Sequence, residues 1–394
     1  MSLHSAVILS GARTPIGCFQ GSLSSFTGPQ LGAHAIRAAL SRSGVSAEAI
    51  EEVLMGCVLS GGVGQAPARQ AAKGAGLPDG VPCTTINKVC GSGMKTVMLA
   101  AQAIALGESQ VIVAGGMESM TNAPYILPGG RAGLRMGHAQ MLDSMIHDGL
   151  WDPYSNQHMG SCGDLCAKEN NYSREAIDEF AAESYRRALA AQADGRLAEE
   201  IEAIPVPQRK GDPVMVSTDE EPGRGNIDKL PTLRPAFGKE GVTTAGNASS
   251  INDGAAALIM ASEGYASEQG LQAIGRVKAW TQHAQQPEWF TTAPAAAVQK
   301  LLDKTGLTQN DIDLFEINEA FSVVAMHTAD TIGIPREKLN VNGGAVSLGH
   351  PIGMTGTRLI LTSLMELRRR GGRYAICSPC IGGGEATAVL IEAL

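Results

Sequence analysis

The sequence predicts an α/β fold of two similar halves with a long insertion, and three observations lead to this prediction. Residues 35–56 match residues 297–318 at a constant offset of 262. Apolar runs suited to strands alternate with amphipathic helical patterns in both halves. Residues 118–248 have no counterpart and are rich in Gly, Pro and charge. With 394 residues, the chain is long enough to form two or more hydrophobic cores.

The internal match pairs residues that suit the same structural role. Ile36 corresponds to Val298, and Gly44 corresponds to Gly306. Each copy is typical of an amphipathic helix that ends at a Gly cap and is followed by a short turn and a strand. Two further pairs match in the same order, NKVCGSGM with NGGAVSLGHPIGMTG and QVIVAGG with RYAICSPC, which disfavours chance. We therefore expect two βαβ-rich domains, each with a mainly parallel central sheet.

Composition and charge exclude several classes of protein. The formal net charge is −8 and no long Lys/Arg cluster occurs, so we expect no nucleic-acid partner. No apolar run comes near the roughly 18 residues of a membrane span, so we expect no membrane partner. Eight cysteines in a chain of this size indicate a reducing compartment, in which each Cys belongs to the core or to the chemistry.

The stretch INKVCGSGMK places Cys90 between a polar run and two closely spaced glycines. Free Cys is among the most buried residue types, so Cys90 can be a small core residue at a strand end. It can also be a nucleophile at a helix N-terminus, where backbone N–H groups and the helix dipole favour a thiolate. This stretch alone leaves both interpretations open.

Three other segments bring reactive groups to predicted strand ends: Asn318 in EINEAF, His350 in NGGAVSLGHPIGMTG and Cys380 in CSPCIGGGEA. Taken singly, they also fit a helix start, a structural histidine and a redox or metal C-x-x-C pair. Metal binding is the weakest option, because no second ligand pair has suitable spacing. Taken with Cys90, they suit acyl transfer: one thiol is acylated, the His activates it, and the second thiol moves a proton.

Motifs along the whole chain resemble the thiolase family in their order and spacing, and most closely its acetoacetyl-CoA thiolases. These motifs are INKVCGSGMK, GGMESMTNAPY, HMGSC, TAGNASSINDGAAA, NEAF, GGAVSLGHPIGMTGTR and CIGGGEA. The resemblance implies the thiolase fold, in which two duplicated halves form a five-layer α-β-α-β-α core. It implies an N-terminal half at 1–117, an inserted loop domain at 118–248 that faces CoA and makes tetramer contacts, a return to the first half at 249–272, and a C-terminal half at 273–394.

The resemblance also implies roles for the candidate catalytic residues. Cys90 is the residue that becomes acylated, and His350 activates it. His350 and a water held by Asn318 form the oxyanion hole for the thioester enolate. Cys380 removes or returns the α-proton of the second acetyl group. The backbone N–H groups of Cys90 and Gly382 form the other oxyanion hole.

By the same resemblance, His158 and Met159 lie near the pantetheine and acyl groups, and Arg224 points toward the CoA nucleotide. No metal and no cofactor beyond the CoA thioester substrate are expected. Pro222 stands where potassium-activated members carry Tyr, which argues against a potassium site. A cytoplasmic homodimer or homotetramer is implied. The remaining residues assigned to the CoA tunnel are Phe237, Ala245, Ser249, Ala320 and Phe321.

The implied activity is the reversible Claisen condensation of two acetyl-CoA to acetoacetyl-CoA and CoA, with ping-pong kinetics through acetylated Cys90. The alternatives are a 3-ketoacyl-CoA thiolase for longer chains and a non-catalytic acyl-CoA or lipid-binding protein. A β-ketoacyl synthase is disfavoured by the second Cys. Two segments depart from the family pattern, Gly163–Leu165 and Glu385–Ala386.

Overall fold

The computed structural model describes residues 4–394 and contains one large sheet made of two equivalent parts. The N-terminal part has the strand order β4-β3-β5-β12-β1, and the C-terminal part has the order β14-β15-β17-β13. In each part the last strand in sequence lies between the first strand and the strand that precedes it in the sequence: β12 lies between β1 and β5, and β17 lies between β13 and β15. The N-terminal strands are β1 (Ala6–Arg13), β3 (Glu52–Gly56), β4 (Cys83–Ile86), β5 (Val111–Ser119) and β12 (Asn252–Ser262), and the C-terminal strands are β13 (Gly275–Ala284), β14 (Leu314–Ile317), β15 (Tyr374–Ser378) and β17 (Glu385–Ala393).

The expectation of mainly parallel sheets is wrong, because each half is mixed. β3 is parallel to β4 and β5, but β12 is antiparallel to both β5 and β1. β17 is likewise antiparallel to β15 and β13. The connection from β15 to β17 holds only the short β16 (Cys380–Ile381), and so short a connection permits only antiparallel pairing.

The predicted repeat is confirmed by its local geometry. Helix α1 (Gly28–Ser43) ends at Gly44 with φ 72°, and α8 (Ala293–Thr305) ends at Gly306 with φ 69°. Both glycines adopt the left-handed conformation that a helix C-cap requires. The third strand of the C-terminal half is reduced to a parallel bridge between Phe315 and Leu339. The two parts of the sheet join where Val7 and Ile8 of β1 pair with β13.

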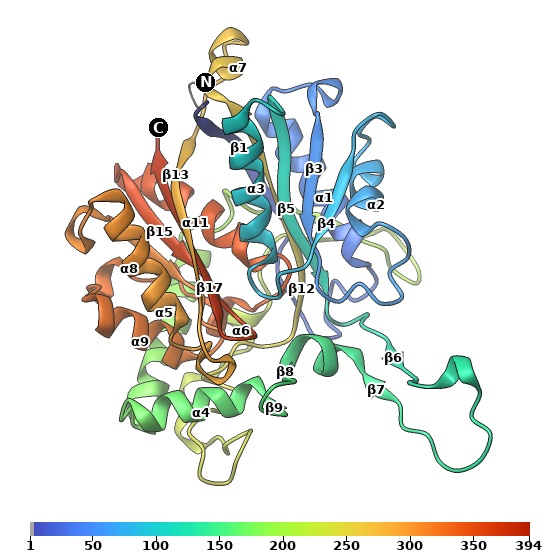
Figure 1. Ribbon diagram of the computed structural model, residues 1–394, viewed down its shortest axis with the longest axis vertical. Coiled ribbons are helices and arrows are strands. Elements are labelled where there is room, and N and C mark those ends of the chain that lie inside the picture. Colours follow the sequence, from blue (N-terminus) through green and yellow to red (C-terminus); the bar gives the residue numbers. More distant parts are fainter. Residues whose placement is uncertain (1–3) are drawn as a thin grey trace.

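Helices and sheet form the five layers (Figure 1). α1 and α2 (Pro67–Gly74) cover the outer face of the N-terminal sheet, and α8 and α9 (Ser322–Ile332) cover the outer face of the C-terminal sheet. Between the sheets, α3 (Ser92–Leu106) packs against α11 (Thr355–Arg370). Three hydrophobic cores fill the spaces between these layers.

Helix α3 contradicts the expectation that no apolar run approaches the length of a membrane span. The window Val89–Leu106 is long and apolar enough to cross a membrane by length and composition. It lies between the two sheets, and 56% of it is buried inside the protein. A helix enclosed on both faces is apolar all round, so its composition reflects its place in the core.

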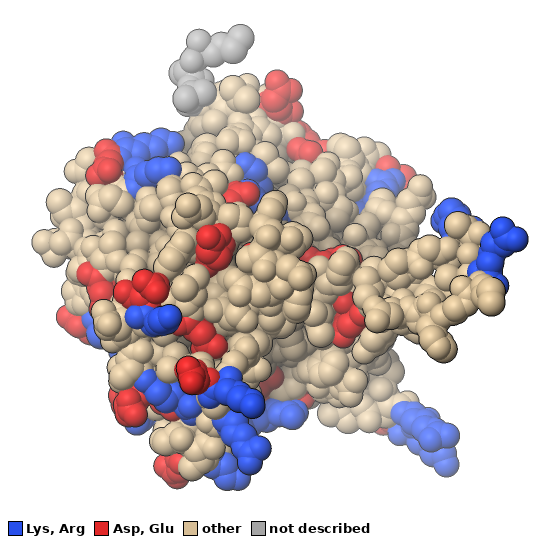
Figure 2. All heavy atoms as spheres, turned by 60° about the horizontal axis from the view of Figure 1, so that its bottom comes forward, with Lys and Arg blue, Asp and Glu red and all other residues tan. Residues whose placement is uncertain are grey.

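The insertion surrounds the lower end of the core in Figure 1 and sends out a long arm from β6 (Tyr125–Ile126) to β7 (Leu142–Asp143). Buried Arg13 of β1 ties the insertion to the core through ion pairs of 2.7 Å with both Glu200 and Asp219. Figure 2 shows Lys and Arg interspersed with Asp and Glu on this face. The other elements are β2 (Gly17–Cys18), β8 (Trp151–Asp152), β9 (Gln157–His158), α4 (Met159–Glu169), α5 (Arg174–Ala193), β10 (Ile204–Val206), β11 (Val214–Val216), α6 (Glu221–Arg224), α7 (Glu263–Glu268) and α10 (Ala345–Leu348).

Three glycines of the N-terminal half surround the carbonyl oxygen of Gly353 from the C-terminal half. A Cβ atom would lie 2.0 Å from this oxygen at Gly116, 2.8 Å at Gly56 and 2.9 Å at Gly93. These positions belong to β5, β3 and α3. The absence of side chains there lets the loop after His350 rest directly on the strand ends of the other half.

We predict that Gly116→Ala lowers the free energy of unfolding by about 1–3 kcal/mol, because the new methyl group overpacks a backbone contact. Gly80→Ala is the matched control, since a Cβ at Gly80 meets nothing within 4 Å. The control is expected to stay within about 0.5 kcal/mol of the parent. Denaturant unfolding of the three proteins checks this, and equal midpoints for Gly116→Ala and the parent would contradict it.

Candidate active site

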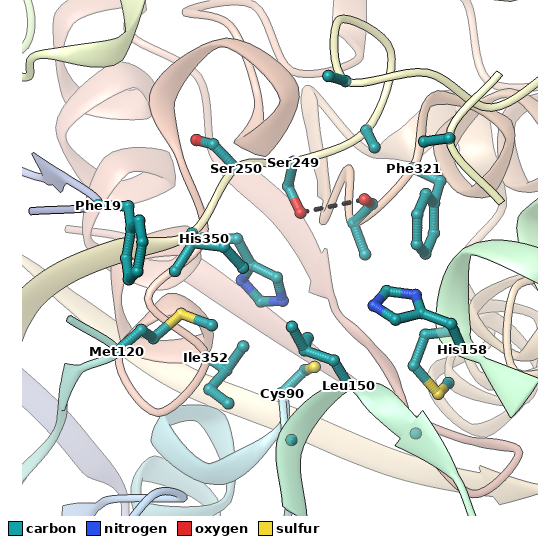
Figure 3. A pocket seen from close by; sticks show the side chains of 18 of the residues that line it. Phe19, Cys90, Met120, Leu150, His158, Ser249, Ser250, Phe321, His350 and Ile352 are labelled. Atoms are coloured by element: carbon teal, nitrogen blue, oxygen red, sulfur yellow. Dashed lines mark hydrogen bonds between the residues drawn. The ribbon is translucent and has the colours of Figure 1, made fainter. Parts of the chain in front are cut away.

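A cavity of about 530 Å³ lies where the strand ends of both halves meet the insertion (Figure 3). It brings together most of the residues predicted from the sequence. Asn318 and Cys380 are not among its lining residues and are buried directly behind its wall. The predicted residues that line it are Cys90, His158, Met159, Arg224, Phe237, Ala245, Ser249, Ala320, Phe321, His350 and Gly382.

Cys90 lies in a tight turn between β4 and α3. Val89 has a positive φ of 46°, and its N–H donates to Asn87 Oδ1 at 3.0 Å. Helix α3 begins at Ser92, and its N-cap Gly91 has no side chain because Ile381 Cδ1 occupies that space, 2.3 Å from an ideal Cβ. The glycine beside Cys90 therefore lets the C-terminal half pack against the turn that carries the thiol.

The environment of Cys90 keeps its thiol protonated at neutral pH. Burial raises the pKa of Cys90 to about 12, and the charge of Glu118 adds to the increase. The backbone N–H groups of Gly382 and of Cys90 itself lower the pKa of this thiol, but by less than burial raises it. The expected preference for a thiolate is therefore not met in the free protein, and the thiol needs a base to become a nucleophile.

His350 can act as that base, because its hydrogen bonds fix one tautomer. Thr355 Oγ1 lies 2.7 Å from His350 Nδ1 and donates its own hydrogen to the Pro351 carbonyl at 2.9 Å. The hydroxyl must therefore accept from Nδ1–H, which leaves Nε2 as the acceptor. Asn318 Nδ2 lies 3.3 Å from this Nε2.

The His350 imidazole is neutral at physiological pH. Burial, and after it the charge of Arg358, lowers the pKa of His350 to about 3. The backbone N–H of His350 donates to Asn252 Oδ1 at 2.8 Å. Gly349 precedes the ring with φ 99° and packs against the Asn252 side chain. A neutral, oriented imidazole is suited to take a proton from a thiol.

Cys380 is 1% exposed in β16. Burial raises the pKa of its thiol well above the usual value, and the neighbouring Cys90 thiol contributes. Cys377 belongs to the core around α3 and α11, whereas Cys380 belongs to the core under α8 and α9. The C-x-x-C spacing therefore does not make a thiol pair, and none of the cysteines described is in a disulfide.

The EINEAF segment is fixed from behind by Glu319. This carboxylate accepts hydrogen bonds from Ser184 at 2.7 Å, from Asn340 at 2.8 Å and from the Val346 N–H at 3.2 Å. The neighbouring Asn318 is fully buried beside His350. Glu319 thus holds the segment, and Asn318 is the side chain of this pair that contacts the site.

Aromatic rings form the wall opposite His350. His158 stacks on Phe237 with ring centroids 4.6 Å apart, and Phe237 meets Phe321 edge-on at 6.3 Å. Ser249 Oγ donates to the Ala320 carbonyl at 3.0 Å, as Figure 3 shows. Together these groups make a narrow and mostly apolar passage toward Cys90.

Sequence reasoning missed other residues of the site. Asn252 and Thr355 orient His350 through hydrogen bonds. Both stand inside motifs that were already singled out, and the hydrogen-bonding capacity of their side chains was the signal that could have identified them. Arg224 is the only Lys or Arg among the described residues that line the cavity. Part of the apolar lining was also missed. Met120, Ile251 and Ile352 stand inside motifs already quoted, whereas Phe19 and Leu150 stand outside them and carried no sequence signal.

The two departures from the family pattern have partners in the structure. Asp164 accepts hydrogen bonds from the N–H groups of Val242 at 2.9 Å and Thr243 at 2.8 Å, which fixes the loop after Phe237. Glu385 forms an ion pair with Lys88. No group of three or more His, Cys, Asp or Glu that could hold a metal occurs among residues 4–394.

Comparisons with known proteins find thiolases that match this chain along nearly its whole length. Residues 6–264 match the family profile described as "Thiolase, N-terminal domain", and residues 271–393 match "Thiolase, C-terminal domain". Acetyl-CoA acetyltransferase 2 of Arabidopsis thaliana is 50% identical, with 98% of this chain and 96% of the relative covered. Acetyl-CoA acetyltransferase of Cupriavidus necator is 49% identical, with 98% of each covered.

Solved structures show the same fold. The Acat5 thiolase of Ascaris suum in complex with coenzyme A has a TM-score of 0.94 and 40% identity, covering 99% of this chain and 100% of that one. The acetyl-CoA acetyltransferase of Bacillus anthracis has a TM-score of 0.97 and 39% identity, and both chains are covered completely.

We predict that Thr355→Val slows alkylation of Cys90 by iodoacetamide at pH 8 by about tenfold. Without the acceptor, Nδ1–H is left unsatisfied, which costs about 1–3 kcal/mol and frees the ring to reorient. Thr355→Ser keeps the hydroxyl and is expected to stay within about twofold of the parent rate. Equal rates for the Val and Ser variants would show that the hydroxyl does not set the tautomer.

Proposed function

The chain belongs to the thiolase family, and from that premise we propose that it is an acetyl-CoA C-acetyltransferase. It condenses two acetyl-CoA into acetoacetyl-CoA and CoA, and it also catalyses the reverse thiolysis. The observation that carries this proposal is that Cys90 and His350 line one apolar cavity, while the Cys380 thiol is buried next to Cys90. Relatives that are about half identical over nearly the whole chain are named acetyl-CoA acetyltransferase.

In the first half-reaction, the Cys90 sulfur attacks the carbonyl carbon of acetyl-CoA while its proton passes to His350 Nε2. The tetrahedral intermediate collapses to S-acetyl-Cys90, and the leaving CoA sulfur takes the proton of the Cys380 thiol. The raised pKa of Cys380 supports this role, because a neutral thiol has a proton to give.

In the second half-reaction, the Cys380 thiolate removes the α-proton of a second acetyl-CoA. The carbanion attacks the acetyl group on Cys90, and acetoacetyl-CoA forms as the Cys90 sulfur leaves. The imidazolium of His350 returns its proton to Cys90, which restores the starting state. Because Cys90 is acylated in one half and released in the other, the kinetics are ping-pong.

Two sets of donors stabilise the developing oxyanions. The backbone N–H groups of Cys90 and Gly382, which lower the pKa of the Cys90 thiol, are suited to hold the carbonyl oxygen of the acyl group. Asn318 and His350, 3.3 Å apart, are suited to hold the enolate oxygen together with a water. Because there are two separate sets of donors, the oxygen of each acyl group is stabilised at its own site.

The remaining expectations are part of the same proposal. The aromatic passage and Arg224 accept the pantetheine and the nucleotide of CoA, with no metal or other cofactor. The enzyme is a cytoplasmic homodimer or homotetramer. Exposed apolar side chains of the insertion's arm support assembly through that segment, since Tyr125 is 62% exposed and Met136 is fully exposed.

We predict that incubation with acetyl-CoA places an acetyl group on Cys90, as found by peptide mass mapping. Cys380→Ser is expected to acquire the same acetyl group but to lose condensation by roughly 10²–10⁴-fold, because it lacks the thiol that moves the α-proton. His4→Ala, far from the cavity, is the control. Acetyl on Cys380, or near-normal condensation by Cys380→Ser, would refute these roles, and a protein that takes up no acetyl would be a binding protein.

We predict that kcat/KM for thiolysis of acetoacetyl-CoA exceeds that for 3-ketodecanoyl-CoA by at least about tenfold, which is roughly 1.4 kcal/mol. Met159 and Phe321 narrow the cavity beside the acyl position, so longer chains must clash or displace a loop. Steady-state rates with both substrates test this. Equal or better use of the C10 substrate would favour the longer-chain 3-ketoacyl-CoA thiolase.

A further inference from the structure

An ion pair links the turn that carries Cys90 to the hairpin that carries Gly382. Lys88 Nζ and Glu385 Oε2 join segments 297 residues apart in the chain. The two side chains are 21% and 36% exposed, so the pair lies at the edge of the core. A pair in this position contributes little to global stability, and its consequences are local.

On one side of the ion pair, Lys88 closes the turn between β4 and α3 that carries Cys90, which we call the nucleophile turn. Its N–H donates to Ser92 Oγ at 2.8 Å, and its carbonyl accepts from the Gly91 N–H at 3.0 Å. Between them stands Val89, whose φ of 46° is unusual for a β-branched residue. Such a conformation persists only where surrounding contacts hold it, and Lys88 is one of the residues that supply them.

On the other side, Glu385 begins β17 directly after the glycine turn. It pairs with Ile381 across the β16–β17 hairpin, and Gly382 lies in the turn between them. Gly382 and Cys90 line the same cavity, and a Cβ built on Gly382 would lie 3.6 Å from Val89 Cγ1. The backbone N–H of Gly382 also lowers the pKa of the Cys90 thiol. Lys88 and Glu385 therefore stand on the two segments whose separation sets the distance between Gly382 and Cys90.

We propose that Lys88 and Glu385 are positioning residues that hold the Gly382 N–H against the sulfur of Cys90, and later against the carbonyl oxygen of the acyl group. This role rests on the proposed function. Lys95 is the third charge nearby: its pKa is lowered by burial and by Lys88 and is raised by Glu385, and its Nζ donates to Gln282 at 3.4 Å.

A double-mutant cycle tests the pair. Glu385→Gln and Lys88→Met are each expected to slow acetylation of Cys90 by acetyl-CoA by about 5–10-fold, since small displacements of a reacting group cost up to roughly 10²-fold. KM is expected to change by less than about twofold. The double variant is expected to be no slower than the slower single variant, because both changes remove one interaction.

Alkylation of Cys90 by iodoacetamide provides a readout that does not depend on thiolase activity. The Gly382 N–H lowers the pKa of Cys90, so its displacement reduces the thiolate fraction, and alkylation at pH 8 is expected to fall by about 3–10-fold in both variants. His350, Cys380 and Glu118, the other titratable groups that act on or face this thiol, are left intact. Lys73→Met is the control, because Lys73 forms an exposed ion pair with Asp79 away from the cavity.

Each outcome decides between positioning and a purely structural pair. Coupled losses in both assays, with Tm within about 2 °C of the parent and the control unchanged, support the proposal. Additive losses, or an unchanged alkylation rate, overturn it. If either variant loses more stability, Glu385→Asp and Lys88→Arg take its place, and failure of these conservative variants to restore the alkylation rate also overturns it. If the parent transfers no acetyl group, the proposed function fails, while the alkylation cycle still tests the pair.

Discussion

The contact between the Gly353 carbonyl and the three glycines of the N-terminal half determines where everything else in the site can lie. With any side chain at Gly56, Gly93 or Gly116, a Cβ would lie within 3 Å of this oxygen. The loop that carries His350 would then have to move away from β3, β5 and α3. Because the contact joins the strand ends of one half to a loop of the other, it brings Cys90 and His350 to the same cavity. The glycines contribute no chemistry themselves, yet the distance between nucleophile and base depends on them.

Burial of Cys90, His350 and Cys380 determines the protonation state of each side chain in the absence of substrate. It raises the pKa of Cys90 and Cys380 and lowers the pKa of His350, so all three are neutral at physiological pH. A neutral thiol and a neutral imidazole exchange a proton only when substrate arrives to stabilise the charges that form. In the proposed mechanism, the same burial strengthens each donor aimed at those charges.

The insertion and the C-terminal hairpin are each tied to other segments around the cavity by a half-buried carboxylate. Asp164 fixes the loop after Phe237, and Glu385 reaches the nucleophile turn through Lys88. Both residues depart from the family pattern, but each finds a partner that ties a cavity wall to the core.

The sequence by itself determined the two-fold repeat, the insertion and which residues are the candidates for the chemistry. Helix periodicity, Gly caps and strand patterns are local, so the match of Gly44 with Gly306 predicted equivalent helix ends that the structure has. The sequence did not determine the direction of the last strand in each half, because alternation of apolar residues is the same in parallel and antiparallel pairs. Nor did it separate Cys377 from Cys380, since three residues of spacing cannot show that their side chains enter different cores. Tertiary structure alone decided the tautomer of His350 and the protonation of Cys90. The tautomer depends on the hydrogen bond from His350 Nδ1 to Thr355, which forms when the 350–355 segment folds. The protonation of Cys90 depends on desolvation, which is complete only when the two halves close on each other.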